Sequence, residues 1–213
     1  MRILITGFEP LQQFWSINPS WEAVSLLPDR IEGAEIIKER IPIAYGRAEE
    51  KLTALIEQHT PDAVICVGQS GADTGVAVER IGINLDDFNV PDNDGNMRID
   101  QKIVEQGPDA YFVTLPVREM VAAIQKAGIP ALLSETAGTH LCNHVTYFTR
   151  HLAATRFPNM ISGFIHIPLD MSQCVDGRGL DLNRNFMDIR VTARALEAAL
   201  SAVAQSLRKV DLT

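Results

Sequence analysis

Short apolar segments alternate with segments of helical periodicity, and this alternation constrains the fold more than any other feature of the chain. Apolar runs typical of strands occupy residues 2–6, 34–42, 62–67, 76–85, 111–115, 129–134 and 163–167. Segments with helical spacing or helix caps lie between them, at residues 19–27, 47–59, 117–126, 141–152 and 189–209. This order predicts an α/β protein, a three-layer α/β/α sandwich with a mainly parallel, mixed central sheet.

Two segments lack a regular pattern. Residues 86–108 are polar and rich in turn formers, and we expect a hairpin or an active-site cover there. Residues 169–188 are expected to be irregular. No internal repeat, low-complexity tract or linker interrupts the chain, so we predict one domain over residues 1–213.

Composition excludes several classes of function. The net charge of −8 argues against a nucleic-acid or anionic-membrane surface, and no apolar run approaches membrane-spanning length. The first strand, Met1 to Thr6, is too short for the apolar core of a signal peptide. Three cysteines without such a peptide argue against a disulfide framework and for the cytoplasm.

A cysteine stands where a strand passes into a helix. The segment Ala137–Val145 contains Cys142 after a turn of small residues, and the apolar positions 141, 145, 148 and 152 mark one face of the following helix. A helix N-terminus offers free N–H groups and a positive dipole end, which favour a thiolate and can stabilise an oxyanion. Cys142 is therefore a candidate nucleophile, although most intracellular cysteines are simply small buried side chains.

A cysteine nucleophile needs a base and a group that orients the base. His166 lies near the end of an apolar run that Pro168 closes, and it is the candidate base. Glu79, followed by Arg80, lies inside another strand-like stretch and is the candidate third group. The alternatives are a hydrogen-bonded core histidine and a structural ion pair between Glu79 and Arg80.

Several motifs together resemble the pyrrolidone-carboxylate peptidases, also called pyroglutamyl peptidases I. They occur in the order found in that family, at residues 6–10, 18–23, 79–84, 91–95, 136–144 and 163–168. The resemblance implies a Cys–His–Glu triad of Cys142, His166 and Glu79 that removes an N-terminal pyroglutamyl residue from peptides. It also implies no cofactor or metal, and a homo-oligomer, a tetramer.

The resemblance further implies a pocket for the lactam ring. Its expected residues are Phe8, Leu11, Asn18, Val90, His140 and Leu141. The chain departs from the family around this pocket. Leu11–Trp15 replaces a Phe-Gly-Gly segment, Asn89 stands where a basic residue is usual, and residues 70–73 differ. We expect Phe14 or Trp15 to fold inward and cover the ring, or the segment to stay mobile until substrate arrives.

Other site types are disfavoured. Residues 92–96 suggest a calcium loop, but its glycine is misplaced and Ile103 stands where the closing glutamate belongs. His140, Cys142 and His144 share one short segment without a second ligand cluster, so a zinc site is disfavoured. No phosphate-binding glycine motif occurs. Two alternatives to the peptidase remain, a weakly active or inactive binding protein and a thiol hydrolase of another small amide.

Overall fold

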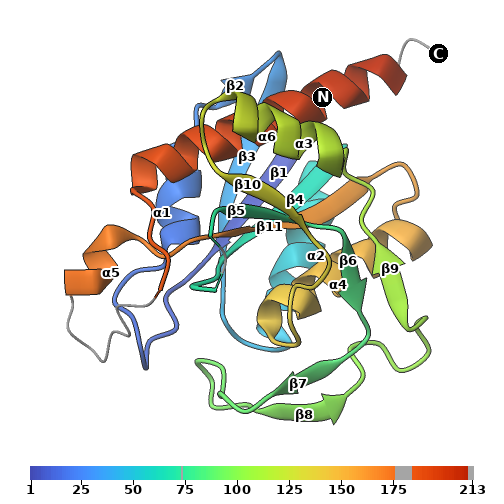
Figure 1. Cartoon of the computed structure of the whole chain (residues 1–213). Helices are drawn as coiled ribbons and strands as arrows, with labels where there is room; N and C mark the ends of the chain where they lie inside the picture. The colour runs from blue at the N-terminus through green and yellow to red at the C-terminus, as the bar shows by residue number, and fades with distance from the viewer. Residues whose placement is uncertain (73, 176–183, 211–213) are drawn as a thin grey trace.

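Seven strands form one mixed sheet in the computed structural model, which describes residues 1–72, 74–175 and 184–210 (Figure 1). In spatial order they are β10 (Ala131–Ser134), β5 (Val76–Glu79), β11 (Ile161–Ile167), β4 (Ala63–Gln69), β1 (Arg2–Phe8), β3 (Ala34–Ile41) and β2 (Arg30–Ile31). Asp73, one of the departures noted above, lies outside the described residues, as do 176–183 within the segment expected to be irregular.

The strands of the sheet run in two directions. Strands β11, β4, β1 and β3 are parallel to their neighbours in this row. Strands β5 and β10 are parallel to each other but antiparallel to β11, and β2 is antiparallel to β3. The prediction of a mainly parallel, mixed sheet is confirmed.

Helices cover both faces of this sheet (Figure 1). On one face α1 (Pro19–Ser25), α3 (Val117–Lys126) and α6 (Ile189–Val210) bury a core against Ile3, Ile5 and Ile65. On the other, α2 (Arg47–His59) and α4 (Leu141–Thr155) pack on Leu4 and Val64. Alternate strand residues therefore supply two cores, because successive side chains point to opposite faces. A short helix, α5 (Met171–Val175), follows β11.

Local chemistry explains where α1 begins. Asn18 precedes the helix, its side chain accepts the Ser20 N–H (3.1 Å), and Pro19 occupies the first helical position. Proline is well suited to that position because its missing N–H would have no partner there. Asn18 also donates to the Glu9 carbonyl (2.9 Å), so this cap ties the helix to the end of β1.

The prediction of one strand over residues 76–85 is wrong. The chain leaves the main sheet at Arg80, and β6 (Ile81–Ile83) pairs instead with β9 (Ala110–Phe112). The reason is a close approach to α4: a Cβ on Gly82 would lie 2.9 Å from the backbone nitrogen of Tyr147. Glycine lets β6 pack directly on the helix, away from the plane of β5.

Two further expectations concern the sheet's periphery. The apolar run at 129–134 forms the edge strand β10, whose residues are only partly buried. The expected hairpin in residues 86–108 is present as β7 (Asp86–Phe88) and β8 (Arg98–Gln101). No helix among the described residues is long and apolar enough to cross a membrane.

Candidate active site

The turn between β10 and α4 holds Cys142 at the second residue of the helix. A backbone hydrogen bond from the His144 N–H to the His140 carbonyl (3.0 Å) closes the first helical turn. The N–H groups of Leu141, Cys142 and Asn143 precede this bond, where helices leave such groups without intrahelical partners. The sulfur therefore lies at the positive end of a helix dipole, as the sequence predicts.

Asn143 fixes this end of α4 against β6. Its side-chain oxygen accepts the Ile83 N–H (2.9 Å), and its side-chain nitrogen donates to the carbonyls of Ile83 (2.9 Å) and Leu85 (2.9 Å). The residue is buried. Three bonds from one buried amide hold the helix N-terminus, and Cys142 with it, in one position.

His166 lies between Cys142 and Glu79. Its Nδ1 is 2.7 Å from Glu79 Oε1, and the imidazole is also hydrogen bonded to the Cys142 thiol. Glu79 reaches the ring because β5 and β11 are antiparallel neighbours, with Ala77 opposite His166. Arg80 instead pairs with Glu135 (2.9 Å), so the alternative of a Glu79–Arg80 ion pair is wrong.

The electrostatics of this group favour a charged imidazole. Burial alone would lower the pKa of His166, but the neighbouring Cys142 sulfur and Glu79 carboxylate outweigh burial and raise the pKa to about 10. These contacts therefore favour a protonated His166 at neutral pH. The bond between Nδ1 and Glu79 fixes the ring and leaves Nε2 for the sulfur.

Gly68 forms the floor beneath the sulfur. It is opposite His166 in the β4–β11 register, and a Cβ placed on it would lie 2.9 Å from Cys142 Sγ and 2.8 Å from Phe164 Cζ. Any larger residue would push on the sulfur and the adjacent ring. The glycine is thus part of how the fold places the cysteine.

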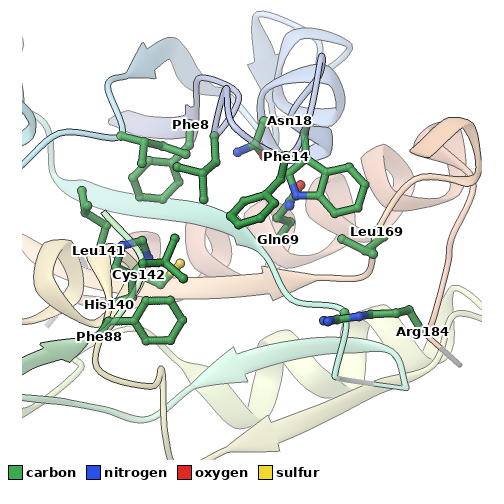
Figure 2. Close-up of a pocket in the computed structure, with 15 residues that line it drawn as sticks. Phe8, Phe14, Asn18, Gln69, Phe88, His140, Leu141, Cys142, Leu169 and Arg184 are labelled. Atoms are coloured by element: carbon green, nitrogen blue, oxygen red, sulfur yellow. The ribbon is translucent and has the colours of Figure 1, made fainter. Parts of the chain in front are cut away.

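A cavity of about 450 Å³ opens beside Cys142 (Figure 2). All six residues expected around the lactam line it, namely Phe8, Leu11, Asn18, Val90, His140 and Leu141. Its lining also includes Gly71, from the departing residues 70–73, and residues that the sequence analysis had not assigned to a pocket, namely Ile43, Gln69, Phe88, Leu169 and Arg184. Most of the wall is apolar, as a pocket for a small uncharged ring requires.

Comparison with known proteins places this geometry in a family. The family model described as pyroglutamyl peptidase matches residues 1–206. The chain belongs to the pyroglutamyl peptidase family. It is 46% identical over 213 residues to a pyrrolidone-carboxylate peptidase of Finegoldia magna, covering all of this chain and 98% of the relative. A Treponema denticola pyrrolidone-carboxylate peptidase is 44% identical over 209 residues, covering 97% and 94%.

Solved structures agree with this placement. A crystal structure of pyroglutamyl peptidase I from Bacillus amyloliquefaciens matches with a TM-score of 0.90 and 36% identity, covering 95% of this chain and 94% of that one. A mutant pyrrolidone carboxyl peptidase from Pyrococcus furiosus matches with a TM-score of 0.91 and 34% identity, covering 97% and 100%. The three-layer fold is therefore that of the pyroglutamyl peptidases.

The segment that departs from the family pattern, Leu11–Trp15, contributes to the cavity wall. The N–H groups of Phe14 and Trp15 donate to the Leu11 carbonyl (2.9 and 3.0 Å), forming a tight turn. Gln12 and Gln13 need no positive φ in it. Both Phe14 and Trp15 line the cavity, and Phe14 is 40% exposed.

Phe88 is the wall residue that sequence reasoning missed most clearly. It follows Asp86 in β7, inside a segment that is polar as a whole. Its ring centroid lies 4.5 Å from that of His140. Burial lowers the pKa of His140 to about 4, so this histidine is neutral at physiological pH. Its Nε2 is buried without a hydrogen-bond partner among the described residues.

A buried charge network lies behind this wall. His144 Nδ1 is 2.8 Å from Asp86 Oδ2 and its Nε2 is 2.8 Å from Glu49 Oε1, while Arg98 contacts Asp86 at 2.9 Å. The Arg98 guanidinium also lies 4.3 Å from the centre of the Tyr45 ring. Although burial opposes it, bonds to both carboxylates raise the pKa of His144. This network joins the β7–β8 hairpin, which carries Phe88, to α2 and α4.

The same contacts explain the two metal-site motifs. His144 binds carboxylates of its own network, and no cluster of three potential metal ligands occurs among the described residues. Asp92 accepts N–H groups from Tyr45 (2.8 Å), Asp94 (3.0 Å) and Asn96 (2.8 Å). Its carboxylate therefore organises a turn of the backbone.

Proposed function

We propose that this protein is a cysteine peptidase that hydrolyses the amide bond after an N-terminal pyroglutamyl residue through an acyl-enzyme. The observation that carries the proposal is the hydrogen-bonded series Cys142–His166–Glu79 beside an apolar cavity. Nucleophile, base and orienting carboxylate come from α4, β11 and β5, and they meet at one end of the sheet.

The reaction follows from that arrangement. The Cys142 thiolate attacks the carbonyl carbon that joins the lactam to the peptide, and the carbonyl oxygen becomes an oxyanion near the N–H groups at the start of α4. The C–N bond breaks as protonated His166 gives its proton to the leaving amine. A water molecule, deprotonated by His166, then attacks the thioester and releases pyroglutamate and the free thiolate. Glu79 keeps the imidazole oriented throughout.

The cavity suits pyroglutamate better than an ordinary N-terminal residue. A free α-amino group is charged and needs a carboxylate, and no Asp or Glu is among the described residues that line the cavity. The lactam is neutral and has one N–H and one carbonyl. Gln69 supplies polar atoms for it, while Phe8 and Leu141 cover its apolar face.

We also infer that the chain works as a single domain in the cytoplasm and as a homo-oligomer, a tetramer. The cytoplasm is supported by the chemistry, since Cys142 must stay a free thiol, as it and Cys66 are in this structure. The oligomer rests on the family resemblance. Light scattering of the purified protein tests the tetramer, and a stable monomer would contradict it.

Amine release from a pyroglutamyl amide tests the function directly, with prolyl and alanyl amides as comparisons. We expect turnover of the pyroglutamyl compound alone, and a loss of about three orders of magnitude in Cys142→Ser. Cys66→Ala is the matched control: Cys66 is fully buried, and burial raises the pKa of its thiol to about 11, so it should be inert. Equal turnover of all three amides would favour a different thiol hydrolase, and no turnover would favour a binding protein.

A further inference from the structure

Among the described residues that line the cavity, Arg184 is the one charged side chain apart from the reactive Cys142, since His140 is neutral. Nothing in the reaction described above uses it. Among the described residues no carboxylate forms an ion pair with its guanidinium; Arg184 shares this with several other arginines, but of these it alone lines the cavity. An arginine left without a carboxylate at the wall of a substrate cavity is a candidate for binding one.

The side chain lies across a glycine at the far side of the cavity. A Cβ on Gly71 would be 2.6 Å from Arg184 Cδ, 3.1 Å from its Nη1 and 3.3 Å from Leu169 Cδ1. Gly71 therefore leaves the space that the arginine occupies. The backbone beside it is anchored, because Leu169 pairs with Phe186 in a β-bridge and the Leu169 N–H donates to the Asn185 carbonyl (3.2 Å).

The two sides of the cavity suit the two sides of the scissile bond. Figure 2 shows Phe8, Leu141, His140 and Phe88 around Cys142, with Leu169 and Arg184 on the opposite side. The guanidinium of Arg184 is directed toward the middle of this group of side chains. A lactam held by the first set places its carbonyl at Cys142. The rest of the peptide then extends toward Leu169 and Arg184.

We propose that Arg184 is a specificity-determining residue that binds a carboxylate on the leaving-group side of the substrate. The inference rests on the proposed function, and it names the preferred substrate class, pyroglutamyl dipeptides with a free C-terminal carboxylate. An aspartate or glutamate side chain after the pyroglutamyl residue presents the same chemistry by a second route. The planar guanidinium can hold either carboxylate through two parallel N–H bonds.

The overall charge of the protein gives this cation a role in binding such substrates. With a net charge of −8, the surface field repels an anionic peptide. Arg184 at the cavity wall offsets that repulsion at the place where the substrate carboxylate binds. Because the contact is remote from the bond that breaks, it acts equally in the ground state and the transition state, and its effect falls on KM.

Three substrates and three variants test the inference. The substrates are pyroglutamyl-alanine, pyroglutamyl-alanine amide and pyroglutamyl-glutamate amide, with the released amine quantified by chromatography. We expect wild type to favour pyroglutamyl-alanine over its amide by about fivefold in kcat/KM, the size typical of an exposed ion pair, with less difference at high salt. Arg184→Gln should bring this ratio to about one, and Arg184→Lys should keep part of it.

Arg190→Gln is the matched control. It removes the same charge from an exposed position at the start of α6, outside the residues that line the cavity, and should keep the wild-type ratio. If wild type prefers pyroglutamyl-glutamate amide over pyroglutamyl-alanine amide, and Arg184→Gln removes that preference too, the site binds the side-chain carboxylate. If wild type hydrolyses all three substrates and Arg184→Gln leaves their ratios unchanged, the inference is wrong while the proposed function stands. If wild type hydrolyses none, both fail.

Discussion

Replacing Gly68 with alanine should impair catalysis while leaving the fold in place. The new methyl carbon would lie 2.9 Å from Cys142 Sγ and 2.8 Å from Phe164 Cζ, whereas ordinary contact begins at 3.4 Å. The sulfur or the strand must therefore shift by at least about 0.5 Å, which is the tolerance within which catalytic groups have to be held. A displacement of this order should lower kcat by about ten- to a hundredfold. The overpacking should cost about 1–3 kcal/mol of unfolding free energy.

A variant at a second glycine, Gly163, separates the loss of kcat from the loss of unfolding free energy. In Gly163→Ala the methyl would lie 2.7 Å from Leu115 Cδ1, a comparable crowding, but in the core on the opposite face of the sheet from Cys142. Urea unfolding should show similar losses of stability in both variants. Steady-state release of amine from a pyroglutamyl amide should show a loss of kcat in Gly68→Ala alone. Wild-type kcat in Gly68→Ala, or an equal loss in both, would refute the idea that Gly68 positions the sulfur.

Three other predictions concern the site and its support. Glu79→Gln should keep the fold, as circular dichroism can verify, and lose much of kcat because it no longer stabilises protonated His166; wild-type turnover would eliminate that role. Although burial opposes ionisation of both groups, the contact with His144 lowers the pKa of Glu49 below 4.5, and the contacts with Asp86 and Glu49 raise the pKa of His144 above 6.5. A double-mutant cycle with Glu49→Gln and His144→Gln measures the coupling free energy between these two residues. This coupling of about 1–3 kcal/mol should be largest from pH 4.5 to 6.5. It should fade as the pH rises through the folded pKa of His144 or falls through that of Glu49, and a pH-independent coupling would contradict this. Trp15→Ala should raise KM for a pyroglutamyl amide with little change in kcat, and an unchanged KM would remove this residue from the pocket.

Much of the fold was predictable because local signals agree with the tertiary structure. The cap formed by Asn18 and Pro19, and the helical spacing after Cys142, each mark an element that the structure contains. The strand break at Arg80 was not predicted, because the apolar residues on both sides of the Glu79–Arg80 pair fit one continuous strand. What divides them is the packing of Gly82 on α4, a contact between segments far apart in the sequence.

The candidate site divides in the same way. Cys142, His166 and Glu79 are predictable as types of residue on separate strands and a helix, and the resemblance adds the six lactam-pocket residues. Phe88 and Arg184 carry no such signal, since both lie in polar segments that look like surface loops. Their place at the cavity follows from the hairpin and from the anchoring of the chain after residue 183, which only the three-dimensional structure contains.

Strand β11 lies in the middle of the sheet although it is the last of its strands in the sequence. During synthesis β4 and β5 must wait, with one edge unpaired, until residues 161–167 leave the ribosome, and unpaired edges invite aggregation. The same strand brings His166, the base that Cys142 needs. A nascent or partly folded chain therefore carries Cys142 without His166. The peptidase activity of this protein arises only when β11 has paired with β4 and β5.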